Sequence, residues 1–105
     1  IFVNHYSPDD TDELVQNFVN KYKDKYGSNP DAFAALTYST IQLYQAAIEK
    51  AGSTNGDTIK DALVNIDTVT VTGSVKFDKS RNPIKSLSVI KIENGSPKLQ
   101  EKINP

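Results

Sequence analysis

The stretch Ser28-Asn29-Pro30-Asp31-Ala32-Phe33-Ala34-Ala35-Leu36-Thr37-Tyr38 opens the longest helix that the sequence predicts. Asn29 is a favourable N-cap residue, and Pro30 suits the first helical position because proline has no N–H to leave unpaired there. Apolar side chains then recur at helical spacing until Ala51-Gly52 ends the run. A helix of this length would span about 33 Å, the width of a small domain. We therefore expect it to be the scaffold of the chain, with unpaired N–H groups in its first turn as a candidate ligand contact.

Length and composition limit the possible classes of protein. The chain has 105 residues, 37% hydrophobic residues, a formal net charge of −1 and no cysteine. This fits one small domain or a piece of a larger one. Because charges of both signs are interspersed, the sequence offers no electrostatic case for binding nucleic acid or an anionic membrane. The chain starts at Ile1 without a methionine or a signal peptide, so we expect a truncated start.

Two elements are predicted before the long helix. Ile1–Tyr6 is β-branched and aromatic, which is typical of a short buried strand. Asp10, followed by Glu13 three residues later, fits a capping box that starts a helix over 11–26. Gly27 is expected to end that helix in a left-handed conformation.

Beyond the long helix the pattern changes from helix to strand. Asn55 or Thr54 is a candidate N-cap for a third helix that reaches Ile66. The alternating run 69–77 predicts one strand, with a bulge or bend at Gly73, and 86–92 predicts another. Asn94-Gly95 favours a hairpin turn that leads into an edge strand over 97–100. The predicted order is therefore β-α-α-α-β-β-β, an α/β chain with three or four strands after the helices.

No group of residues assembles an active site. The acidic cluster before the second element lacks the glycine and distal glutamate of a calcium loop, so helix capping explains it better; its members are Asp9, Asp10, Asp12 and Glu13. His5 is the only histidine, so no histidine pair can hold a metal. No nucleophile elbow or glycine-rich phosphate loop is present. The tyrosines at helical spacing favour packing over a stacking platform. We predict no metal, no cofactor and no enzyme activity.

A family resemblance runs through these motifs in order. The segments that carry it are Tyr26–Tyr38, Ala46-Ala47-Ile48-Glu49-Lys50-Ala51-Gly52-Ser53, Ile59–Leu63, Val71-Thr72-Gly73-Ser74-Val75-Lys76-Phe77-Asp78 and Ile90–Gly95. Over essentially its whole length the chain resembles the C-terminal part of bacterial substrate-binding proteins of branched-chain amino acid ABC transporters. It departs from the family at Ser39, where an aspartate often follows the helix tyrosine.

The resemblance implies an incomplete piece of a two-lobed type I periplasmic-binding-protein fold. By this analogy residues 1–7 and 84–105 belong to lobe 2, and residues 8–83 belong to lobe 1. The implied function is capture of a small ligand, a branched-chain or related amino acid, for ABC permease subunits. The implied location is extracytoplasmic, either the periplasm or a cell-surface lipoprotein. One alternative is a ligand-sensing receptor domain of the same fold, coupled to a signalling or regulatory partner. Another is a small adaptor domain without a ligand.

The family also suggests ligand-binding positions. An aromatic residue at the start of the scaffold helix lines the pocket in family members, and Phe33 matches it, with Ala32 beside it. A phenylalanine there can shield an aliphatic side chain; the competing interpretation is a plain core residue. His5 and Tyr6 are weaker candidates beside the hinge. The other polar contacts of the family lie upstream, so we expect the chain alone to bind ligand weakly or not at all. Open sheet edges also predict that it self-associates.

Overall fold

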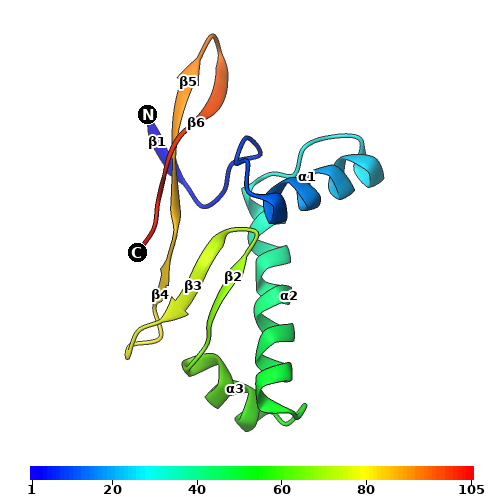
Figure 1. The fold of residues 1–105 in the computed structure, drawn as a ribbon, viewed down its shortest axis with the longest axis vertical. Helices are drawn as coiled ribbons and strands as arrows, with labels where there is room; N and C mark the ends of the chain where they lie inside the picture. Colours follow the sequence, from blue (N-terminus) through cyan, green and yellow to red (C-terminus); the bar gives the residue numbers. More distant parts are fainter.

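A long helix, two shorter helices and two three-stranded sheets make up the chain in a computed structural model that describes residues 1–105 (Figure 1). One strand before three helices confirms the predicted α/β class, although five strands rather than three or four follow the helices. No helix is both long and apolar enough to cross a membrane. The elements, in order, are β1 (Phe2–Asn4), α1 (Glu13–Tyr26), α2 (Ala32–Ala51), α3 (Gly56–Val64), β2 (Asp67–Thr70), β3 (Gly73–Phe77), β4 (Pro83–Lys85), β5 (Leu87–Glu93) and β6 (Ser96–Ile103).

The long helix α2 begins two residues later than its sequence pattern predicts. Asp31, and not Asn29, is the N-cap: its backbone is extended and its Oδ1 accepts the Ala34 N–H at 2.8 Å. The prediction was wrong because Asn29 and Asp31, two positions apart, can both cap a helix, and the extended Asp31 leaves Pro30 outside it. At the other end Gly52 adopts φ 61° and closes the helix as predicted.

The start of α1 also differs from the predicted capping box. Asp12 caps the helix by accepting the Leu14 N–H at 2.9 Å. Asp10 lies outside α1, because its carboxylate accepts hydrogen bonds from the Asp12 N–H and from Lys102. Two predicted ends are confirmed: Gly27 is left-handed after α1, and Asn55 caps α3.

The predicted single strand over 69–77 is instead the hairpin β2–β3. The strands pair antiparallel with Thr70 opposite Gly73, and Gly73 has φ 92°, a conformation that favours glycine. The tip of the hairpin is held by α2, since Ser39 Oγ donates to Thr70 Oγ1 at 2.6 Å and lies 3.0 Å from Thr72 Oγ1. The alternation of apolar and polar residues therefore runs through both β2 and β3. The sequence pattern does not show the turn between them.

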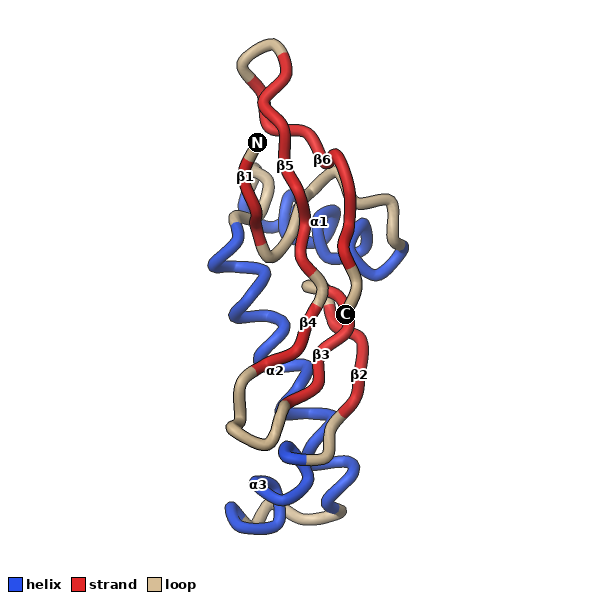
Figure 2. The backbone as a smooth tube through the Cα atoms, turned by 90° about the vertical axis from the view of Figure 1, so that its left-hand side faces the viewer, coloured by secondary structure: helices blue, strands red, loops and turns tan.

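The two sheets lie end to end along the molecule (Figure 2). One sheet has the strand order β1-β5-β6 and the other β2-β3-β4, all antiparallel. The chain passes between them before α1 and again at Ser86, which lies between β4 and β5. The predicted boundary between residues 83 and 84 stays a prediction; the change of sheet occurs at Ser86. In β1, Phe2 and Val3 are exposed, so the expectation of a buried strand was wrong. Successive side chains of a strand point to opposite faces, so neither face of β1 is covered at these positions.

The core is divided into two small clusters, one at each end of α2. The cluster at the start of α2 includes Val15 and Phe18 from α1 and Ala35 from α2. Tyr6 and the tip of the hairpin β2–β3 pack against these residues. At the other end α2 and α3 pack through Ala47, Ile59, Ala62 and Ile66. The Cα radius of gyration is 15.1 Å and the extents are 49 × 31 × 19 Å. A compact domain of this length would have a radius of gyration of about 13 Å, so the chain is elongated.

Candidate functional site

Phe33, the strongest candidate from the sequence, is the second residue of α2 and is 79% exposed. It does not enter the core, so the interpretation as a plain core residue does not describe its position in this chain. Its ring lines an open groove of about 580 Å³ between α1 and α2. The groove is lined by Phe18, Lys21, Tyr22, Lys25, Tyr26, Phe33, Ala34, Thr37, Tyr38 and Ile41.

Five aromatic rings line this groove, those of Phe18, Tyr22, Tyr26, Phe33 and Tyr38. The Phe18 ring lies 4.7 Å from the Tyr38 ring and 6.0 Å from the Tyr22 ring, centroid to centroid. Tyr22 in turn lies 4.6 Å from Tyr26. The predicted packing role of the tyrosines is therefore seen on α1, while Tyr38 and Tyr26 also keep exposed surface. Such a surface can shield an apolar group from water.

Tyr6 lies beneath the start of α2 and is only 4% exposed. Its hydroxyl donates to the Pro30 carbonyl at 3.2 Å, and its ring meets the Phe18 ring edge-on at 6.3 Å. Burial, and then the nearby Asp31 and Asp9 carboxylates, raise the pKa of Tyr6 to about 12. The hydroxyl therefore stays protonated at physiological pH and connects the segment after β1 to the residue before the cap of α2.

The remaining two candidates lie apart from the aromatic groove. His5 follows β1 and is exposed, and its backbone N–H donates to Asn4 Oδ1 at 2.8 Å. Ala32 is half-buried in the first turn of α2, next to Phe33. Of the four predicted residues only Phe33 lines the groove. The ligand-binding roles of all four stay predictions.

A second, polar cavity of about 570 Å³ lies where the two sheets meet, and the sequence did not indicate it. Asp10 was interpreted there as a helix cap, and no local pattern singles out Ser86, Lys102 or Asn104. Their contacts join residues that are far apart in the chain, up to 92 positions for Asp10 and Lys102. The cavity is lined by Asp10, Thr11, Asp12, Val69, Gly73, Ser74, Ser86, Lys102 and Asn104.

Comparison with solved structures finds the same fold in solute-binding proteins. A leucine binding protein from Thermotoga maritima is 33% identical, with a TM-score of 0.80 over 99% of this chain. A branched-chain amino acid transporter substrate binding protein from Streptococcus pneumoniae, solved with isoleucine, is 30% identical, with a TM-score of 0.79 over 99% of the chain. A solute binding protein from R. palustris, solved with benzoate, is 22% identical with a TM-score of 0.81 over 98% of the chain, which shows the fold alone.

In each comparison this chain spans about 30% of the solved protein. The fold class predicted from the resemblance, a fragment of a type I periplasmic-binding-protein fold, is thereby confirmed. The family model described as "Periplasmic binding protein" matches residues 1–97, nearly the whole chain. The chain belongs to the periplasmic binding protein family.

Proposed function

We propose that this chain is the C-terminal part of an extracytoplasmic solute-binding protein that captures a branched-chain or related amino acid for an ABC importer. The observation that carries the proposal is the exposed Phe33 ring at the start of α2, in a chain similar over 99% of its length to leucine- and isoleucine-binding proteins. Tyr26 and Ile41 are also exposed and line the same groove as Phe33, so the ring belongs to a contiguous apolar patch. Contiguous exposed apolar patches of this kind mark binding surfaces.

The first turn of α2 suits an amino acid chemically. Backbone N–H groups at a helix start have no intrahelical partner, and the helix dipole favours negative charge there, which suits a carboxylate. The Phe33 ring can cover an aliphatic side chain beside them, a burial that stabilises by about 1.5–3 kcal/mol. Ala32 is small and leaves the helix end open. His5 and Tyr6 remain weaker candidates, and Tyr6 would act through its contact with Pro30 rather than through a free hydroxyl.

The two sheets support the proposed division into lobes. We assign residues 1–7 and 84–105 to lobe 2 and residues 8–83 to lobe 1. The sheet β1-β5-β6 falls in the first set, and α1, α2, α3, β2 and β3 fall in the second. The strand β4 crosses this boundary because it pairs with β3. A ligand held between lobes would lie near the passages that join the sheets.

Calorimetry on the longer protein that contains this chain tests the proposal. We expect leucine, isoleucine or valine to bind, with benzoate as a test of the aromatic-acid alternative. Loss of the Phe33 ring in Phe33→Ala removes about 1.5–3 kcal/mol of apolar contact, so affinity should fall tenfold or more. Tyr44→Ala is the matched control, because Tyr44 is also exposed on α2 but lies outside the groove. Equal affinity in both variants would exclude Phe33 from the site, and no binding of any aliphatic amino acid would refute the proposed ligand class.

The isolated chain should behave differently from the longer protein. Because the 105 residues span about 30% of the length of the solved solute-binding proteins, we expect no micromolar binding of these amino acids to the 105 residues alone. We also propose that the isolated chain self-associates through its open strand edges. A monodisperse monomer in light scattering at high concentration would contradict this.

The proposal also includes a location and a protein partner. The family supports an extracytoplasmic location; a periplasmic or a lipid-anchored form is the finer alternative. Permease subunits would receive the ligand. Uptake of labelled leucine in cells that lack the gene, compared with complemented cells, tests the partner, and unchanged uptake would count against it.

A further inference from the structure

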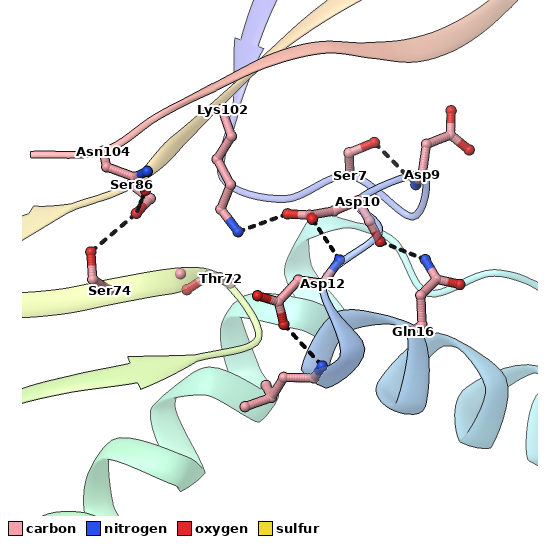
Figure 3. A network of polar contacts seen from close by, with 12 residues as sticks. Ser7, Asp9, Asp10, Asp12, Gln16, Thr72, Ser74, Ser86, Lys102 and Asn104 are labelled. Atoms are coloured by element: carbon pink, nitrogen blue, oxygen red, sulfur yellow. Dashed lines mark hydrogen bonds and ion pairs between the residues drawn. The ribbon is translucent and has the colours of Figure 1, made fainter.

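The two sheets of the chain are joined at a polar junction formed by Asp10, Gly73, Ser86, Lys102 and Asn104 (Figure 3). Only two passages of the chain cross between the sheets, one before α1 and one at Ser86. Besides these passages, the Ser86 N–H donates to the Ser74 carbonyl at 3.3 Å, and side-chain contacts also hold the sheets relative to each other. Ser86 supplies two of them, donating to Asn104 Oδ1 at 2.8 Å and lying 3.2 Å from Ser74 Oγ.

The shortest ion pair of the chain lies in this junction. Lys102 Nζ lies 2.7 Å from Asp10 Oδ2, and the side chains are only 26% and 12% exposed. Figure 3 shows Lys102 extending from β6 toward Asp10, which lies in the passage that leads to α1. The other carboxylate oxygen of Asp10 accepts the Asp12 N–H at 3.0 Å, so the carboxylate is held from both sides.

The stem of Lys102 also reaches the second sheet. A methyl group added at Gly73 would lie 3.6 Å from Lys102 Cε, and both residues line the same polar cavity, so the stem runs close to the hairpin β2–β3. Lys102 therefore belongs to one sheet, pairs with the passage before α1 and lies close to the other sheet. The neighbouring ion pair between Lys98 and Asp9 is looser and more exposed. Lys98 Nζ lies 3.7 Å from Asp9 Oδ2, and the two side chains are 55% and 38% exposed.

We propose that the Asp10–Lys102 pair is a latch that fixes the angle between the two sheets, and with it the position of α2 and Phe33 relative to the sheet β1-β5-β6. Lys102 and Asp10 are positioning residues in this scheme and touch no ligand. The use of the latch rests on the proposed function, in which a ligand lies between the parts that the sheets belong to. Removal of one member of a desolvated pair leaves an uncompensated charge, so water and motion should enter the junction.

Distances between spin labels measure the angle without any ligand. The chain has no cysteine, so Gln45→Cys on α2 and Gln100→Cys on β6 provide a clean pair of label sites on exposed positions. Labelled chain is diluted into excess unlabelled chain, so that contacts between copies do not contribute. Lys102→Met keeps the stem and removes the charge, and Asp10→Asn keeps an acceptor for the Asp12 N–H.

We expect the label distance distribution to widen about twofold in Lys102→Met and in Asp10→Asn, because each breaks the same restraint. The double variant should be no wider than the wider single variant, and Lys98→Met should match the parent. Parent-like widths in both single variants would overturn the proposal. So would equal widening in Lys98→Met, or loss of helical circular dichroism in both single variants, since the pair would then serve folding rather than orientation. Because no ligand is present, failure of amino acid binding leaves this result intact.

Discussion

Replacement of Gly73 by alanine should strongly destabilise the chain at the junction of the sheets. The new Cβ would lie 2.6 Å from Ser86 Cβ and 2.7 Å from Ser86 Oγ, far inside van der Waals contact. Ser86 cannot move aside cheaply, because its N–H donates to the Ser74 carbonyl and its hydroxyl to Asn104. The backbone is also unfavourable for alanine, since Gly73 has φ 92°.

The expected magnitude is the sum of a conformational term and a steric term. Positive φ costs an L-residue about 1–2 kcal/mol. Overpacking that forces the backbone to shift costs about 1–3 kcal/mol. Gly73→Ala should therefore lower the free energy of unfolding by about 2–5 kcal/mol, a large part of the stability of a small domain.

Urea denaturation followed by circular dichroism separates the two terms with matched glycines. Gly52 has φ 61° but open space around it, so Gly52→Ala should lose only the conformational term, about 1–2 kcal/mol. Gly56 has open space and no positive φ, so Gly56→Ala should be neutral or slightly stabilising. Gly73→Ala combined with Ser86→Gly removes the clash and should recover about 1–3 kcal/mol relative to the sum of the single changes.

Two results would refute this reasoning. If Gly73→Ala cost no more than Gly52→Ala, the sheets would not meet closely at Ser86. If the combination with Ser86→Gly recovered no stability, the destabilisation by Gly73→Ala would arise from the backbone conformation alone. The close approach of Gly73 and Ser86 would then contribute nothing to it.

Four further outcomes follow from single contacts. Ser39→Ala should lose about 1–3 kcal/mol, because buried threonine hydroxyls lose their partner, while Thr40→Ala on the exposed face should change little; urea denaturation compares them. Tyr6 should titrate with a pKa of about 12 in ultraviolet difference spectra. Because this folded-state pKa exceeds the value of 10.0 for an unperturbed tyrosine, stability should fall as pH rises from 10 towards 12; Tyr6→Phe should abolish the late titration. Asp12→Ala should remove the α1 cap and cost about 1 kcal/mol in thermal unfolding. Phe33→Ala should change stability by less than about 0.5 kcal/mol in the same assay, and a larger loss would mean that the ring packs in the fold.

Local chemistry predicted three of the six helix ends, at Gly27, Gly52 and Asn55, and one hairpin, whereas α3 ends at Val64 and not at Ile66 as predicted. Gly27 and Gly52 end their helices in left-handed conformations, and Asn94-Gly95 forms the predicted turn between β5 and β6. These features succeed because each depends on residues within one turn of the chain. The start of α2 failed by two residues, since Asn29 and Asp31 are both able to cap and only the surrounding fold selects one.

In the candidate site, too, one feature was predicted from the sequence and another was seen only in the structure. The family motif pointed to Phe33, and the structure places it at an exposed helix start beside the aromatic groove. The polar junction was invisible in the sequence, because Asp10 and Lys102 are 92 positions apart. The alternation around Gly73 was compatible with one bent strand or two paired ones. In the structure the two strands pair with each other, and Ser39, which is distant in the chain, holds the tip of the hairpin.

The sequence by itself determined that one strand and three helices precede the remaining strands, that glycines end α1 and α2, and to which family the chain belongs. These depend on local backbone preferences and on motifs read along the chain. Only the tertiary structure decided that Asp10 leaves the helix to hold Lys102, that Gly73 turns a strand into a hairpin against Ser86, and that the Phe33 ring stays outside the core. Each of these is settled by which distant groups come within contact distance, and no local pattern carries that information.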